Sequence, residues 1–311
     1  MGYGSYSHDA HAALLKTRSD QRQEVFRQTS THPLMNPKGV RLRESRDSAE
    51  HPKSTPIVFA LDVTGSMGEI PKLLAKHQLP LFMKALTDCK VSDPQVMFVA
   101  VGDATSDAAP LQVGQFETTA ELMDQWLTLS FLEGGGGGQG KESYELALYF
   151  LSQHTEMDAF VKRQKKGFLF MTGDEKPYPQ VSKHVVEAVV GDRLDADVPL
   201  DAVVAEVSRT FHTFFLIPDL NRRGACERIW RKVLGEHVIC MEAPQDICFG
   251  AACIVAMTEK TVTEFEQLQG VLKAAHCPED RIGPVMRALA PYAETLGLSP
   301  SRLKAFFRAL T

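Results

Sequence analysis

Three oxygen-bearing side chains follow a short apolar run early in the chain. Asp62 ends the run 57–61, and Thr64 and Ser66 follow at alternate positions with Gly65 between them. Such a run, rich in branched and aromatic residues, is typical of a buried strand in a parallel sheet, which places ligands just beyond the carboxyl ends of its strands. Carboxylate and hydroxyl oxygens there suit a hard cation such as Mg²⁺. The competing interpretation is that Asp62 and Ser66 cap the following helix.

From residue 57 onwards the chain alternates apolar runs with helical patterns. The expected strands are 57–61, 95–101, 111–116, 167–172, 211–217 and 237–241, and helical periodicity occupies about 69–87, 119–129, 141–153, 181–190 and 224–234. Strands separated by helices form a mostly parallel sheet covered on both faces. The sequence therefore predicts a doubly wound α/β fold. The run 111–116 closely follows 95–101, which favours an antiparallel edge strand.

The segments on either side of this pattern differ from it. We expect an N-terminal extension at 1–54, an α/β domain at 55–258 and a C-terminal helical segment at 259–311. The extension is highly charged, and we expect a short helix there around Val25 and Phe26. The last helix is expected to begin with Ser299 as cap and Pro300, and its apolar stripe favours core packing over a partner site: Leu303, Phe306, Phe307 and Leu310.

Other polar residues fall at the ends of predicted strands. Asp103 follows the strand 95–101, and Asp174 follows the strand 167–172. A glycine run at 134–138 stands just before the helix expected at 141–153. Because the carboxyl ends of parallel strands meet at one edge, these features strengthen the metal interpretation of Asp62.

The order of these motifs resembles the von Willebrand factor A (vWA) domain with its metal-ion-dependent adhesion site (MIDAS). The resemblance covers roughly residues 55 to 255 and implies a Rossmann-like vWA fold of the stand-alone intracellular type. It implies that Thr64 and Ser66 ligate the ion directly, and that Asp62 and Asp174 act directly or through water. Mg²⁺ is the expected ion, with Mn²⁺ and Ca²⁺ as alternatives.

In this family a glycine-loop residue also contributes to the site. Here Gln139 stands at that position, and its amide oxygen brings no charge, while Lys141 adds a cation nearby. Whether Gln139 or Asp103 contributes to the site is left open.

The resemblance also implies a function without catalysis. Such domains leave one coordination position open, and a carboxylate from a partner protein completes it. We therefore expect a magnesium-dependent protein–protein interaction module or adaptor rather than an enzyme. Complexes built around AAA+ ATPases are among the partners that the resemblance implies.

The glycine-rich loop allows one alternative, a P-loop-like nucleotide-binding protein or ATPase. Gly135, Gly140 and Lys141 match the spacing G-x-x-x-x-G-K. A P-loop needs a serine or threonine next, because its hydroxyl ligates Mg²⁺. Glu142 stands there instead and would repel phosphates. This alternative also leaves Asp62, Thr64 and Ser66 unexplained.

Composition and simple motifs bear on which partners, cellular location and enzyme classes to expect. The chain has 311 residues and a net charge of -5, which gives no electrostatic reason to expect nucleic acid or a membrane surface as partner. No secretory signal is visible, and no apolar run approaches the roughly 20 residues of a membrane helix. The six cysteines form no CxxC pair, which favours a reducing compartment, and we expect a cytoplasmic protein. Hydrolase motifs are absent, and His212 in an apolar strand favours a core histidine.

Overall fold

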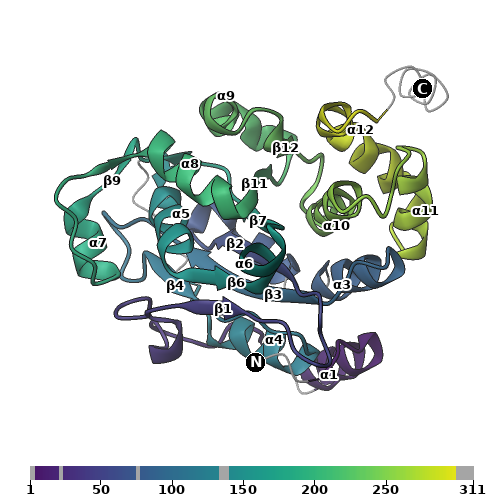
Figure 1. Ribbon diagram of the computed structural model, residues 1–311, viewed down its shortest axis with the longest axis horizontal. Coiled ribbons are helices and arrows are strands. Elements are labelled where there is room, and N and C mark those ends of the chain that lie inside the picture. The colour runs from purple at the N-terminus through teal and green to yellow at the C-terminus, as the bar shows by residue number, and fades with distance from the viewer. Residues whose placement is uncertain (1–3, 21–23, 75–77, 133–139, 299–311) are drawn as a thin grey trace.

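A six-stranded, mostly parallel sheet lies at the centre of the molecule (Figure 1). The computed structural model describes residues 4–20, 24–74, 78–132 and 140–298. The strand order is β12 (Val238–Cys240), β11 (Phe211–Ile217), β7 (Gly167–Thr172), β2 (Thr55–Asp62), β3 (Pro94–Val101), β4 (Leu111–Val113). All neighbours pair in parallel except β4, which is antiparallel to β3. The predicted α/β sheet with an antiparallel edge is confirmed.

Helices cover both faces of this sheet, as predicted. Successive side chains of a strand point to opposite faces, so Phe59 joins one core and its neighbours Val58 and Ala60 join the other. The first core is covered by α3 (Leu79–Asp88), α4 (Ala120–Leu129) and α10 (Ile247–Thr258). The opposite core is covered by α5 (Tyr144–Gln153), α8 (Leu200–Thr210) and α9 (Arg223–Leu234). Every residue of β2 is buried as a result.

Some helix boundaries differ from the prediction. The helix expected at 141–153 begins only at Tyr144, because Lys141–Glu142 form the short strand β5, which pairs with β8 (Lys176–Pro177). The described part of 69–87 holds α2 (Ile70–Leu73) and α3, and 181–190 contains α7 (Lys183–Val189). The strands β9 (Gln180–Val181) and β10 (Val198–Pro199) flank α7.

The N-terminal segment, the described part of residues 4–54, contacts the rest of the chain through α1 (His8–Asp20), β1 (Arg43–Ser45) and Val25. The helix α1 packs against α4, and β1 pairs in parallel with β6 (Thr155–Met157). Around Val25 the described residues form no helix, so that prediction was wrong. Val25 is instead fully buried in the first core.

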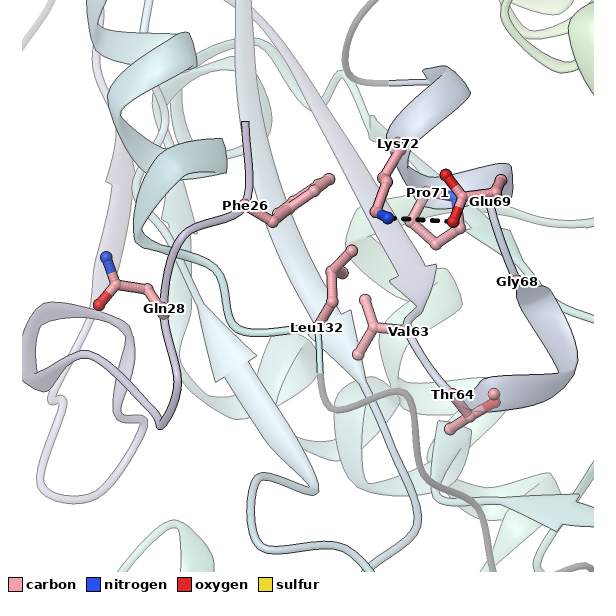
Figure 2. Close-up of a pocket in the computed structure, with 10 residues that line it drawn as sticks. Phe26, Gln28, Val63, Thr64, Gly68, Glu69, Pro71, Lys72 and Leu132 are labelled. Atoms are coloured by element: carbon pink, nitrogen blue, oxygen red, sulfur yellow. Dashed lines mark hydrogen bonds and ion pairs between the residues drawn. The ribbon is translucent and has the colours of Figure 1, made fainter. Parts of the chain in front are cut away.

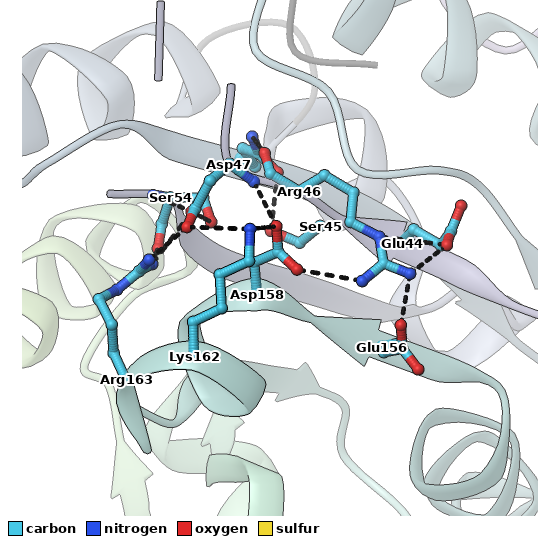
Figure 3. Close-up of polar contacts among 10 residues, drawn as sticks. Glu44, Ser45, Arg46, Asp47, Ser54, Glu156, Asp158, Lys162 and Arg163 are labelled. Atoms are coloured by element: carbon cyan, nitrogen blue, oxygen red, sulfur yellow. Dashed lines mark hydrogen bonds and ion pairs between the residues drawn. The ribbon is translucent and has the colours of Figure 1, made fainter. Parts of the chain in front are cut away.

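Ion pairs and hydrogen bonds of charged side chains hold this segment where β1 lies beside β6 and α6 (Asp158–Arg163), as Figure 3 shows. Arg46 contacts Glu44, Glu156 and Asp158. Asp47 accepts bonds from Arg163 and from the hydroxyl of Ser54.

The C-terminal helices share the core of the sheet. The helices α11 (Gln267–Ala274) and α12 (Glu279–Thr295) pack on each other and on α10, and Leu268, Leu272 and Leu289 belong to the first core. The domain boundaries at 54 and 258 stay predictions. The predicted last helix, with Ser299 and its apolar stripe, lies outside the described residues. All six cysteines are free thiols, and in the described ranges no helix has the length and apolar character to cross a membrane.

Candidate metal centre

The sheet topology brings Asp62 and Asp174 to one place. Numbered along the chain, the strands lie in the order 3-2-1-4-5-6, which reverses between β2 and β7. Asp62 is the last residue of β2, and Asp174 lies two residues beyond β7. Ligands of open α/β sheets bind in the crevice at this reversal. The predicted common edge of these two aspartates is therefore present.

Asp62 holds Thr64 in a fixed orientation. One carboxylate oxygen, Oδ1, accepts the backbone N–H of Thr64 at 3.0 Å and its Oγ1 hydroxyl at 2.6 Å. Thr64 precedes the short 3-10 helix Gly65–Met67 without capping it by its side chain, and α2 has no side-chain cap either. The geometry therefore does not favour the helix-cap interpretation of this motif.

The hydroxyls of Thr64 and Ser66 face one another. Their oxygens lie 3.2 Å apart, and Ser66 Oγ donates to Asp174 Oδ1 at 2.9 Å. Each hydroxyl has a carboxylate acceptor for its single proton, which leaves lone pairs of both oxygens available to a cation. Neighbouring ligands of an octahedral Mg²⁺ at about 2.1 Å would lie roughly 3 Å apart. The spacing of this hydroxyl pair fits such an ion.

The electrostatics of Asp62 also suit a nearby cation. Burial raises the pKa of Asp62 to about 7, the charge of Asp174 adds to the rise, and hydrogen bonds from Thr64 and Tyr144 oppose it. A positive ion beside this carboxylate would favour its charged form and lower its pKa.

Tyr144 fixes the second oxygen of Asp62. Its hydroxyl, at the start of α5, donates to Asp62 Oδ2 at 2.6 Å. The ring passes over Gly173, where an added Cβ would lie 2.0 Å from the Tyr144 hydroxyl oxygen. Glycine at 173 is therefore required for this close approach. With Oδ1 and Oδ2 both engaged by the protein, Asp62 is suited to orient Thr64 and to act through water.

Glu142 supplies an unpartnered buried oxygen next to these residues. It is 2% exposed, and its Oε2 has no hydrogen-bond partner. Burial and, to a smaller extent, the nearby charge of Asp62 raise its pKa to about 9. A cation within reach would satisfy this oxygen, which makes Glu142 a candidate ligand. Gln139, the residue expected there from the sequence, lies outside the described residues.

Asp103 is engaged in a turn of its own. It accepts the backbone N–H of Thr105 at 2.9 Å, the Thr105 hydroxyl at 2.7 Å and the Tyr178 hydroxyl at 3.0 Å. Within the described ranges no hydrogen bond joins it to Asp62, Thr64, Ser66 or Asp174. The structure therefore gives Asp103 no part in holding the hydroxyl pair.

A cavity of about 400 Å³ opens beside Thr64 (Figure 2). Phe26 and Gln28 of the N-terminal segment line it together with Leu132. Lys72, which pairs with Glu69 at 3.0 Å, lies on another part of its wall. The candidate centre thus adjoins a space with apolar and charged walls.

Sequence reasoning missed three residues at this edge: Glu142, Tyr144 and Arg222. Arg222 follows β11, the neighbour of β7, and its guanidinium contacts Asp174. Its place after the strand expected at 211–217 is a signal that could have identified it. Glu142 stands beside the glycine run, which is a weaker signal. Tyr144 lies within an apolar helical pattern and offers none.

The nucleotide-binding alternative is not favoured by the described part of its loop. Lys141 lies in strand β5 with its ammonium 5.3 Å from the centre of the Tyr178 ring. The helix begins three residues later, so Lys141 does not stand at its first turn as in a P-loop. In the described ranges no group of three or more His, Cys, Asp or Glu side chains could hold a metal, so the candidate centre depends on its hydroxyls.

No family model and no curated protein sequence matches the chain. Similar solved structures include the pilus adhesin SpaC from Lactobacillus rhamnosus GG in an open conformation, with a TM-score of 0.45, 9% identity and coverage of 69% of this chain and 31% of that chain. A proximal thread matrix protein 1 from the mussel byssus, described with a zinc-occupied MIDAS motif, gives a TM-score of 0.41, 10% identity and coverage of 76% and 49%. A von Willebrand factor type A protein from Catenulispora acidiphila gives 0.40, 13% identity, and 66% and 43%. The chain spans less than half of each of these proteins, and similarities of this size do not assign a family.

Proposed function

We propose that the chain is a divalent-metal-dependent protein-interaction module. The observation that carries the proposal is the pair of hydroxyl oxygens of Thr64 and Ser66, 3.2 Å apart, with both protons directed to buried carboxylates. Thr64 and Ser66 would ligate the ion, and Asp62 and Asp174 would orient them and bind directly or through water. Glu142 would add a charged ligand from the loop before α5.

Mg²⁺ is the ion that this all-oxygen set suits best, and it retains water readily where the protein leaves positions open. The bound ion would supply a positive charge to which a partner's carboxylate binds. The cavity beside Thr64 offers space for a neighbouring side chain of that partner. Catalysis is not part of the proposal, and the intracellular location and the adaptor role expected from the sequence remain proposals too.

Calorimetric titration with Mg²⁺ tests the metal site. Thr64→Val and Ser66→Ala should each lower the affinity at least about tenfold, since each removes a hydroxyl ligand of the ion. Thr105→Val is a matched control, because Thr105 makes the same pair of bonds to Asp103 but lies in a separate turn. Equal affinities in the wild type, Thr64→Val and Ser66→Ala would refute the site.

Partner recognition requires a second experiment. Immobilised peptides that differ only by glutamate or glutamine at one position are probed with the protein in Mg²⁺ or in chelator. We expect binding to the glutamate peptides in Mg²⁺ alone, and loss of that binding in Ser66→Ala. Binding that ignores both the chelator and the carboxylate would contradict the interaction role.

A further inference from the structure

The guanidinium of Arg222 lies against the candidate metal centre. Its Nη1 forms an ion pair with Asp174 Oδ2 and donates to the backbone oxygen of Ser66 at 2.6 Å. Its Nε pairs with Asp219 Oδ2 at 2.8 Å. Arg222 therefore contacts two of the residues proposed to hold the ion, from a loop that follows a different strand.

The contact with Asp174 would set Arg222 and a bound metal ion in competition for one carboxylate. Asp174 Oδ1 accepts the hydroxyl of Ser66, and Oδ2 binds Arg222. Among the salt bridges of the described residues, Asp174 pairs only with Arg222. A divalent ion held at Asp174 would stand close to the guanidinium, and like charges in a partly buried site repel strongly. A bound ion and Arg222 would therefore compete for this carboxylate.

Asp219 gives Arg222 a second partner within its own loop. Asp219 Oδ1 accepts the backbone N–H of Asn221 at 2.9 Å, which fixes this carboxylate beside Arg222. On leaving Asp174, the guanidinium would keep its bond to Asp219 and would not be left without a counter-charge. The segment 219–222 connects β11 to α9, and its Leu220 is 46% exposed. Displacement of the guanidinium would thus change the conformation of the exposed segment 219–222 beside the candidate metal centre.

We propose that Arg222 is a resident cation that competes with the divalent ion for Asp174, so that metal binding releases segment 219–222 from the site. The proposal rests on the metal site proposed above. Arg222 then lowers the affinity for the ion and couples its binding to a surface that a partner could contact. Neither the lowered affinity nor this coupling would be expected from the proposed ligands Thr64, Ser66 and Asp174 alone.

Calorimetry with Mg²⁺ on the wild type, Arg222→Gln and Arg223→Gln tests this competition. Arg223 is a matched control, since it is the next residue but pairs with Glu227 at 2.9 Å on α9. Arg222→Gln should bind Mg²⁺ at least about tenfold more tightly, because a hydrogen bond to a charged group contributes more than one decade in affinity. Arg223→Gln should match the wild type. Hydrogen exchange of the 218–224 peptide should rise when Mg²⁺ is added to the wild type.

The outcomes separate the two proposals. Tighter binding by Arg222→Gln supports the competition, as does binding by this variant when the wild type binds no ion. If the wild type binds Mg²⁺ and Arg222→Gln binds it with equal or lower affinity, the competition is overturned and the metal site stays in place. Absence of binding in both proteins overturns the metal site and the competition with it. Circular dichroism of each variant confirms that it is folded.

Discussion

The Tyr144 hydroxyl lies 2.6 Å from Asp62 Oδ2, so the first residue of α5 binds the last residue of β2. This bond takes one carboxylate oxygen, and Thr64 takes the other. These bonds hold Asp62 in one orientation, which keeps its Oδ1 as the acceptor for the Thr64 hydroxyl. The orientation of the hydroxyl pair depends on a residue that would not ligate the ion.

Tyr144→Phe should weaken the metal site without removing a ligand. The phenyl ring keeps its packing on Phe215 and Trp230, but Asp62 Oδ2 loses its donor. An unpaired buried polar atom costs about 1–3 kcal/mol, so we expect a loss of this size in urea unfolding and a weaker Mg²⁺ affinity. Tyr149→Phe is the control, because Tyr149 lies on the same helix as Tyr144 but its hydroxyl donates to a different carboxylate, that of Asp192. An unchanged Mg²⁺ affinity in Tyr144→Phe would contradict the orienting role.

Gly173→Ala should displace Tyr144. The added Cβ would lie 2.0 Å from the Tyr144 oxygen and 2.7 Å from its Cζ, so the ring must move or the backbone must shift. Overpacking of this kind costs about 1–3 kcal/mol. The double variant Gly173→Ala with Tyr144→Phe removes the nearer contact only, and should lose less stability than the sum of the single variants. Gly224→Ala, with open space around its Cβ, is the control.

Glu142→Gln should lower the Mg²⁺ affinity without lowering the stability of the metal-free protein. Its folded pKa of about 9 exceeds the usual 4.5, so the folded state binds more protons between these values and loses stability as pH rises through them. The neutral glutamine avoids that loss, so at pH 8 the metal-free variant should be at least as stable as the wild type. Its Mg²⁺ affinity should fall about tenfold or more, because a charged ligand is removed.

Glu145→Gln provides the control for this prediction. Glu145 is buried on α5 and burial raises its pKa to about 8, but one of its oxygens accepts the backbone N–H of Tyr178. At pH 8 Glu145→Gln should likewise be at least as stable as the wild type, but its Mg²⁺ affinity should not change. Equal Mg²⁺ binding by the wild type and Glu142→Gln would exclude Glu142 as a ligand.

The fold could be predicted because its signals are local. Each strand of the central sheet is a short apolar run, so β2, β7 and β11 were found close to their observed bounds. Asp62 and Asp174 followed from the rule that parallel strands share their carboxyl edge. By contrast, β5 pairs only two residues with a distant segment, and nothing in Lys141 or Glu142 marks them as a strand.

The contacts of the candidate centre were harder to predict than its location. The Tyr144 bond to Asp62 spans 82 positions and depends on a glycine at 173 that lets the ring pass. The contact of Arg222 depends on β11 lying beside β7, which the order of elements along the chain does not specify. Such contacts arise from tertiary packing, whereas strand and helix patterns arise from neighbouring residues.

Arg46→Met should loosen the N-terminal segment. The methionine keeps an apolar stem but removes the contacts to Glu44, Glu156 and Asp158 (Figure 3). Asp158 is nearly buried and keeps its bond from Lys162 at 2.6 Å, so we expect a loss of about 1–3 kcal/mol in urea unfolding. Hydrogen exchange should rise in β1. Arg209→Met breaks an exposed pair with Glu206 and should cost less than about 1 kcal/mol. Equal losses in both variants would refute the anchoring role.

His212 should make the protein less stable in mild acid. Burial, with smaller contributions from Lys166 and His237, lowers the pKa of His212 from 6.5 to about 4. Between these values the unfolded chain binds more protons than the folded one, so stability rises with pH across the window and is lost as pH falls.

His212→Phe should remove this part of the pH dependence. Its ring can pack on Phe168, whose centre lies 5.4 Å from that of His212. The wild type should lose up to about 2 kcal/mol more than the variant between pH 7 and pH 5. Urea unfolding of both proteins at the two pH values measures the difference, in which the titrations of Glu142 and Glu145 cancel because both proteins contain them. Equal losses would show that His212 titrates normally in the folded state.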